Sequence, residues 1–153
     1  MPKKSAGLLL FRRRDGRLEV LLAHPGGPLW ESKDDGVWTI PKGEFDANED
    51  PLDAARREFE EETGGTPDGD FIPLEPLRQP SGKLIYAWAV EGDFDPTALK
   101  SNSFHMEWPP RSGKQGEFPE VDRAEWLTVE TAARKISVGQ RPFLDQLQLT
   151  LDE

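Results

Sequence analysis

The chain has 153 residues, of which 35% are hydrophobic and 31% are charged. This length predicts one domain spanning residues 1–153, large enough to bury a core without disulfides. The formal net charge of −10 excludes a non-specific binder of polymeric nucleic acid or anionic membrane, since such binding depends on clustered Lys and Arg. A small phosphorylated ligand stays compatible with that charge if a metal ion supplies positive charge.

The chain contains no cysteine, which excludes disulfides, thiolate zinc sites and cysteine nucleophiles. Its longest apolar stretch near the N-terminus, Ala6–Phe11, is shorter than the roughly 7–15 residues of a signal peptide core. It is also far shorter than the roughly 20 residues that span a membrane. We therefore expect a cytoplasmic protein.

The first forty residues predict three short strands, at Ala6–Phe11, Leu18–Ala23 and Val37–Ile40. The turn at Asp15-Gly16 joins the first two as a hairpin.

The clearest helix spans Pro51–Thr63. Asp50 is a suitable N-cap, and Pro51 fits the first helical position. Gly64 can adopt the left-handed conformation that ends the helix.

The rest of the chain predicts further strands and two C-terminal helices, which together indicate an α/β fold with a mixed sheet. The segment Phe94–Glu120 is rich in Pro, Gly and Ser, so we expect it to be irregular apart from one short strand. The expected strands are Ile72–Leu77, Leu84–Val90, Phe104–Trp108 and Ala124–Leu127, and the expected helices are Val129–Ile136 and Pro142–Leu149.

Three glutamates gather on one face of the central helix. Glu58, Glu61 and Glu62 stand at positions i, i+3 and i+4, where like charges repel one another. They also lie towards the C-terminal end of the helix, where its dipole disfavours anions. Bound divalent cations would offset both costs, and a local violation of this kind often marks a functional site.

The alternative is a solvated acidic face on which Arg57 pairs with Glu61. The upstream residues favour the metal site, because Gly43 allows close backbone approach and Glu49 adds a further carboxylate ahead of the helix. A ligand set made only of oxygen atoms suits magnesium or manganese rather than zinc.

The spacing Gly43-x5-Glu49-x7-Arg57-Glu58-Phe59-x-Glu61-Glu62-x-Gly64 resembles the signature of the Nudix hydrolases. The resemblance covers Gly43–Gly65 and departs only at Gly65, where the family usually has an apolar residue. It implies a Nudix-type α/β/α sandwich with a mixed sheet, one central catalytic helix and C-terminal helices.

The resemblance also implies a magnesium-dependent hydrolase of nucleoside diphosphates linked to another group, X, with Mn2+ able to replace Mg2+. Carried onto this chain, Glu58, Glu61 and Glu62 become metal ligands, and the Gly43 carbonyl a further one. Arg57 is expected to orient the glutamates by ion pairing.

The carboxylate that accepts a proton from the attacking water is left open between two residues. Glu58 is one candidate. Glu120 is the other, and also a candidate metal ligand, because several Nudix enzymes carry a glutamate six residues before a tryptophan, here Trp126. The alternative is that Glu120 is an ordinary solvated loop residue.

The segments Ser5–Arg13 and Pro41–Glu44 resemble the diadenosine tetraphosphate hydrolase branch, which implies a dinucleoside polyphosphate substrate. Cationic and aromatic side chains could meet its phosphates and base, although ordinary surface or packing roles are the alternative for each. The candidates are Lys42, Lys83, Tyr86 and Trp108.

Two other functions remain open. One is a nucleoside triphosphate pyrophosphatase that removes damaged nucleotides, and the other is a Nudix module that senses a nucleotide without cleaving it. A small nucleotide is the expected partner, and the oligomeric state is left unassigned.

Overall fold

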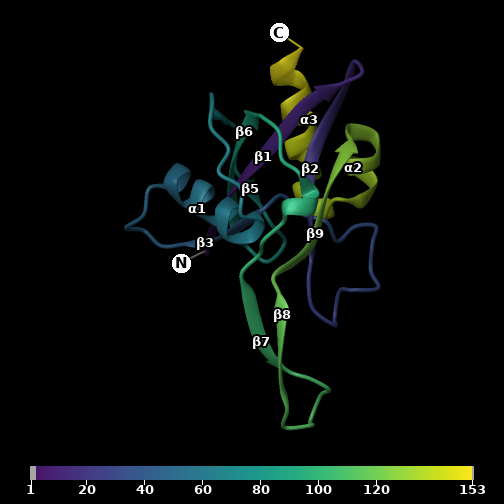
Figure 1. Cartoon of the computed structure of the whole chain (residues 1–153). Coiled ribbons are helices and arrows are strands. Elements are labelled where there is room, and N and C mark those ends of the chain that lie inside the picture. The colour runs from purple at the N-terminus through teal and green to yellow at the C-terminus, as the bar shows by residue number, and fades with distance from the viewer. Residues whose placement is uncertain (1–2, 153) are drawn as a thin grey trace.

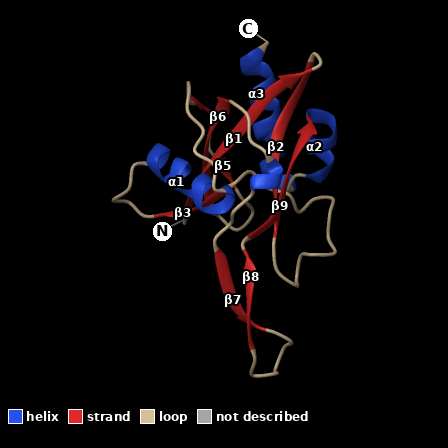
Figure 2. Cartoon of the chain, viewed as in Figure 1, coloured by secondary structure: helices blue, strands red, loops and turns tan. Residues whose placement is uncertain are grey.

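A computed structural model describes residues 3–152 of the chain. Helices flank a mixed sheet whose main path runs β4-β6-β1-β2-β9, with β3 beside β1 and β5 beside β6 (Figures 1 and 2). A separate ribbon of β7 and β8 projects from one end of the molecule (Figure 1). The strands are β1 (Lys4–Arg14), β2 (Arg17–Pro25), β3 (Lys42–Phe45), β4 (Ile72–Pro73), β5 (Leu77–Arg78), β6 (Leu84–Glu91), β7 (Ser103–Glu107), β8 (Gln115–Pro119) and β9 (Val121–Thr128). The helices are α1 (Pro51–Thr63), α2 (Val129–Lys135) and α3 (Arg141–Leu151), with short 3-10 turns η1 (Pro96–Ala98) and η2 (Val138–Gln140).

Strand β1 lies at the centre of the sheet and is buried on both faces. It pairs in parallel with β6 and antiparallel with β2 and β3. Leu8 and Leu10 pack on one face with Phe59 of α1, whereas Leu9 packs on the other with Phe143 of α3. Because side chains alternate along a strand, this apolar run serves both layers at once. The expected α/β/α sandwich is confirmed.

The central helix is confirmed with its predicted bounds. The Asp50 side chain accepts a hydrogen bond from the Asp53 backbone N–H at 3.1 Å, which satisfies a free donor of the first turn. Gly64 ends the helix in the left-handed region at φ 83°.

The expected strand at Val37–Ile40 is wrong in position. Thr39 makes only an isolated bridge, to Ala23, and the strand itself, β3, begins at Lys42. The reason is that Trp38 and Ile40 are fully buried without continuous pairing. Burial therefore explains their apolar character, and ladder pairing starts only after Pro41, which has no N–H to donate.

The expected strand at Ile72–Leu77 is also wrong in extent. The structure has two short pieces instead, β4 and β5, both paired with β6. Pro73 is the last residue of β4, and Pro76, which has no N–H to donate, lies in the gap between the two pieces.

The segment expected to be irregular contains a hairpin. The strand predicted at Phe104–Trp108 is present as β7, but its partner β8 was not predicted. Exposed Gln115 and Glu117 alternate with Gly116 and Phe118 in β8, so its apolar pattern is weak. The pairing of β8 with β7 is what defines it.

The remaining predicted elements are confirmed with small shifts. The strand at Leu84–Val90 is β6, and that at Ala124–Leu127 lies within β9. The two C-terminal helices correspond to α2 and α3. Across residues 3–152, none of the helices combines the length and the apolarity that crossing a membrane requires.

We predict that Asp50→Ala lowers the free energy of unfolding by about 1 kcal/mol, because the first turn of α1 loses its cap. Urea denaturation measures this change. Asp50→Asn is the matched control, since asparagine keeps the accepting oxygen and is expected to retain most of the stability. Equal destabilisation by both substitutions would contradict the cap assignment.

Candidate active site

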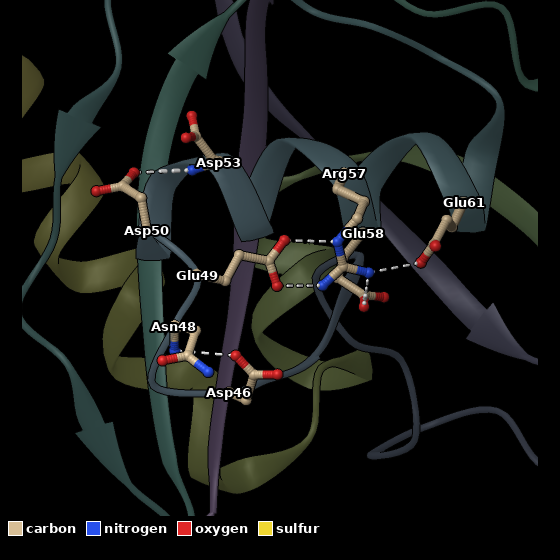
Figure 3. A network of polar contacts seen from close by, with 8 residues as sticks. All are labelled: Asp46, Asn48, Glu49, Asp50, Asp53, Arg57, Glu58 and Glu61. Atoms are coloured by element: carbon tan, nitrogen blue, oxygen red, sulfur yellow. Dashed lines mark hydrogen bonds and ion pairs between the residues drawn. The ribbon is translucent and has the colours of Figure 1, made fainter.

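The site begins with Arg57, whose guanidinium binds one carboxylate of the loop before α1 and two in the C-terminal half of the helix (Figure 3). Its Nε and Nη2 donate to the two oxygens of Glu49 at 2.7 and 2.8 Å. Its Nη1 donates to Glu58 Oε1 at 2.7 Å and to Glu61 Oε2 at 3.0 Å. The hydrogen bond to Glu49, followed by that to Glu58, raises the pKa of Arg57 further above its ordinary value. Arg57 therefore ties the preceding loop to two helix carboxylates.

Strand β3 brings Gly43 directly against Glu58. An added Cβ at Gly43 would coincide with the Glu58 carboxylate, so only glycine leaves room for that group. Glu58 Oε1 is turned towards Arg57, while the Oε2 side crowds Gly43. The glycine thus forms a cradle for a carboxylate that is only 8% exposed.

Burial sets the electrostatics of this face. Burial raises the pKa of Glu62 to about 8, although its Oε1 accepts a hydrogen bond from the Lys42 backbone N–H at 3.2 Å. Burial also raises the pKa of Glu58, against the hydrogen bond from Arg57 and with the help of the nearby Glu61 charge. The pKa of Lys42 is lowered, first by burial and then by the neighbouring Lys83. Negative charge on this face is therefore incompletely compensated by the protein.

Glu120 comes to the same place from the turn between β8 and β9. Its backbone N–H donates to the Asn102 carbonyl at 2.8 Å, and the Asn102 N–H donates to the Glu61 carbonyl at 2.8 Å. On its other side, the Glu120 carbonyl accepts from the Gly26 N–H at 2.9 Å. The Glu120 charge contributes to the raised pKa values of Glu58 and Glu62, after burial as the main cause. The structure therefore places Glu120 near Glu58 and Glu62, which share α1 with Glu61.

Contacts of Gly26 and His24, which the sequence analysis did not assign to the site, keep the turn between β8 and β9 in place. A Cβ on Gly26 would collide with the Pro119 carbonyl, so the close approach requires glycine. His24 is buried. Its Nδ1 lies 2.8 Å from Asp122 Oδ1, and its Nε2 donates to the Lys33 carbonyl at 2.6 Å. The run Pro25-Gly26-Gly27 after a strand is a sequence signal for a close backbone approach at Gly26. The Asn102 contacts are made by its backbone alone, so no residue type in the sequence indicates them.

Of the four candidate substrate residues, Lys42 lies at the carboxylates and the other three have partners elsewhere. Lys83 pairs with Glu44 at 2.9 Å. The Tyr86 ring packs edge-on against Phe45 at 6.0 Å. Trp108 follows β7 in the projecting hairpin, where its backbone N–H donates to the Lys114 carbonyl, so the fold does not bring it to α1 (Figure 1).

Within residues 3–152, no group of three or more His, Cys, Asp or Glu side chains is arranged to hold a metal ion. One oxygen of Glu58 and one of Glu61 face the Arg57 guanidinium. The donors nevertheless fit a hard divalent cation: they are all oxygens, partly buried, and opposed by a glycine that leaves space.

The match to known proteins decides the family. A family model described as the NUDIX domain matches residues 1–147 of the chain. The chain belongs to the Nudix family. It is accordingly a Nudix hydrolase, and the sequence resemblance centred on Gly43–Gly65 is confirmed.

Two relatives agree with this membership. The chain is 38% identical over 148 residues to an RNA pyrophosphohydrolase of Bartonella henselae, a match covering 84% of this chain and 78% of that protein. Over 66 residues it is 39% identical to an asymmetrical bis(5'-nucleosyl)-tetraphosphatase of Caenorhabditis elegans, covering 43% of this chain and 44% of that protein.

Solved Nudix structures share the fold. A C. elegans Ap4A hydrolase in a binary complex has a TM-score of 0.67 at 24% identity and covers 98% of both chains. The NUDIX domain of Shewanella oneidensis NrtR, complexed with ADP ribose, has a TM-score of 0.68 at 16% identity, covering 99% of this chain and 89% of that one. At these identities the likeness concerns the fold alone.

We predict that Gly43→Ala lowers hydrolytic activity by about a hundredfold, because the new methyl group displaces the Glu58 carboxylate by the order of an ångström. The far end of a flexible side chain can yield, so the melting temperature is expected to change little. Activity assays and thermal melts of the same preparation test both points. Full activity in the variant would contradict the placement of Glu58 in the site.

Proposed function

We propose that this Nudix pyrophosphohydrolase uses a divalent cation, Mg2+ or Mn2+, to cleave dinucleoside polyphosphates such as diadenosine tetraphosphate. The observation that carries the proposal is the meeting of Glu58, Glu61, Glu62 and Glu120, contributed by a helix and by a distant turn. A binding-only module has no evident need of four such carboxylates.

In this proposal, Glu58, Glu61 and Glu62 hold the cation, with the Gly43 carbonyl and Glu120 as further ligands. A bound divalent cation neutralises phosphate charge and lowers the pKa of a coordinated water. Arg57 keeps Glu58 and Glu61 in one geometry, which preorganises the site before the substrate arrives.

The residues also suggest how the proton is handled. Glu58 Oε1 already accepts a hydrogen bond from Arg57, whereas Glu120 is exposed. We therefore assign Glu120 as the general base: one of its oxygens, the other being free to bind the cation, takes the proton from water as the water oxygen attacks phosphorus. The bond from that phosphorus to the bridging oxygen breaks, and the oxygen leaves with the departing phosphate group. Lys42 supplies positive charge beside Glu62 for the phosphate chain.

The substrate choice is supported by the C. elegans relative named bis(5'-nucleosyl)-tetraphosphatase and by the N-terminal resemblance to the same branch. A second candidate is removal of pyrophosphate from 5'-triphosphorylated RNA, which the Bartonella henselae relative favours. The net charge of −10 weighs against the RNA chain, because phosphates beyond the site would meet an acidic protein.

We predict that Glu61→Gln lowers kcat by about a hundredfold or more, because a cation ligand loses its charge. Glu60→Gln is the matched control, since Glu60 is an exposed glutamate of the same helix that is not part of the Arg57 network. The control is expected to keep the wild-type kcat. Equal loss in both variants would point to general electrostatics and contradict a specific site.

Substrate profiling distinguishes the candidate functions. We expect diadenosine tetraphosphate to give ATP and AMP faster than 5'-triphosphorylated RNA releases pyrophosphate, with kcat/KM as the measure. Preference for the RNA would establish the second candidate, and preference for damaged nucleoside triphosphates would establish a house-cleaning pyrophosphatase. If no phosphoanhydride is cleaved with Mg2+ or Mn2+, the enzyme proposal fails and the nucleotide-sensing alternative is favoured.

A further inference from the structure

A cavity of about 450 Å3 is lined by residues of β1, β9 and the segment 93–96, none of which is a candidate site residue. Another, of about 290 Å3, is lined in part by Lys42, whose backbone contacts Glu62. We name the second the Trp30 cavity. Its walls come from the segment between β2 and β3 and from the link between α2 and α3. The residues that matter are Pro25, Trp30, Val37, Thr39, Lys42 and Gln140.

The Trp30 cavity has two direct links to the candidate site. Lys42 lines the cavity, and its backbone N–H donates to Glu62 Oε1. Pro25 also lines it, and the next residue, Gly26, donates its N–H to the Glu120 carbonyl. Lys42 therefore lies between the cavity and Glu62, so one extended ligand can reach both.

The wall residues combine a flat apolar surface with a polar group. Trp30 is 40% exposed, which is unusual for so large an apolar side chain in a soluble domain. Two backbone hydrogen bonds hold it in its turn, from its own N–H to the Gly27 carbonyl and from the Lys33 N–H to its carbonyl. The indole is therefore presented by an ordered turn.

The polar group is the buried amide of Gln140, which is only 4% exposed. Its Oε1 accepts a hydrogen bond from the Ile40 backbone N–H at 3.0 Å, and its Nε2 donates to Thr39 Oγ1 at 2.9 Å. A primary amide carries two donor hydrogens, so Nε2 has a second one besides that used with Thr39. These contacts fix the amide in one orientation at the cavity wall.

We propose that the Trp30 cavity binds a nucleobase of the substrate, stacked on Trp30, while the phosphate chain extends past Lys42 to the carboxylates. This inference rests on the proposed function, because it requires a nucleotide substrate. An aromatic base matches the flat indole, and its hydrogen-bonding edge matches a polar cavity wall. A volume of about 290 Å3 lies near the small end of ligand sites and suits one base rather than a protein surface.

This assignment replaces the stacking partners expected from the sequence. The Tyr86 ring already packs edge-on against Phe45 in the apolar layer under α1. The Trp30 ring has the Lys33 ammonium 5.1 Å from its centre, which leaves its other face for a base. Trp108 belongs to the projecting hairpin. The sequence pattern does not single out Trp30, which lies between β2 and β3 outside the strands of the structure.

Calorimetric titration of ADP and of inorganic pyrophosphate, each with Mg2+, tests the proposal. Trp30→Ala is expected to weaken ADP binding by about 10- to 100-fold and to leave pyrophosphate binding unchanged, because only ADP carries a base. Trp30→Phe, which keeps an aromatic face, is expected to bind ADP within roughly threefold of the wild type. Leu29→Ala is the matched control, since Leu29 is 54% exposed and lies outside the cavity wall.

Three results would overturn the proposal. Unchanged ADP binding in Trp30→Ala would remove the stacking role. Equal weakening of ADP and pyrophosphate would assign Trp30 to the shape of the carboxylate face instead. Failure of the wild type to bind ADP, with pyrophosphate still bound, would contradict the nucleotide substrate of the proposed function itself, whereas the first two results leave that function standing.

Discussion

The site depends on how the protein tolerates several carboxylates on one helix face. Glu58, Glu61 and Glu62 repel one another, and burial adds a cost to each charge that leaves water. Arg57 offsets part of this cost by donating to Glu58 and Glu61 while Glu49 holds the guanidinium from the other side. Within residues 3–152, Glu62 accepts one hydrogen bond, from the Lys42 backbone N–H, and burial raises its pKa to about 8. The remaining imbalance is what a divalent cation would relieve.

The sandwich fold converts this local feature into a site. Strand β3 pairs with the first residues of β1, and this pairing places Gly43 against Glu58. The preceding residue, Lys42, contacts Glu62 and lines the Trp30 cavity. Asn102 links the backbone of Glu61 to that of Glu120 by two hydrogen bonds of 2.8 Å. A helix, a short strand and a distant turn thus meet at one point, which lets the site be rigid before any ligand binds.

Local chemistry made α1 predictable from the sequence. Its cap, its proline and its terminal glycine act within a few residues, so Asp50 and Gly64 could be assigned directly. The family signature in turn identified the helix glutamates and Gly43 as a set. Both predictions depend on spacing along the chain, which the sequence contains in full.

Non-local contacts account for what the sequence did not predict. Trp38 and Ile40 are apolar because they are buried, although they form no continuous strand pairing. The sequence pattern therefore placed the strand a few residues too early in the chain. The hairpin strand β8 depends on pairing with β7 more than on its own pattern. Trp30 gains its place only because the loop folds beside Gln140, more than a hundred residues along the chain.

The central claim is that the carboxylate face of α1 is a divalent-cation site, and Mn2+ binding tests it most directly. Titration of the chain with Mn2+, followed by electron paramagnetic resonance, measures free ion as protein is added. We expect saturable binding in the wild type, competed by Mg2+, and its loss when Glu58 and Glu62 are both replaced by Gln. Wild-type hydrolysis without saturable Mn2+ or Mg2+ binding would contradict the account.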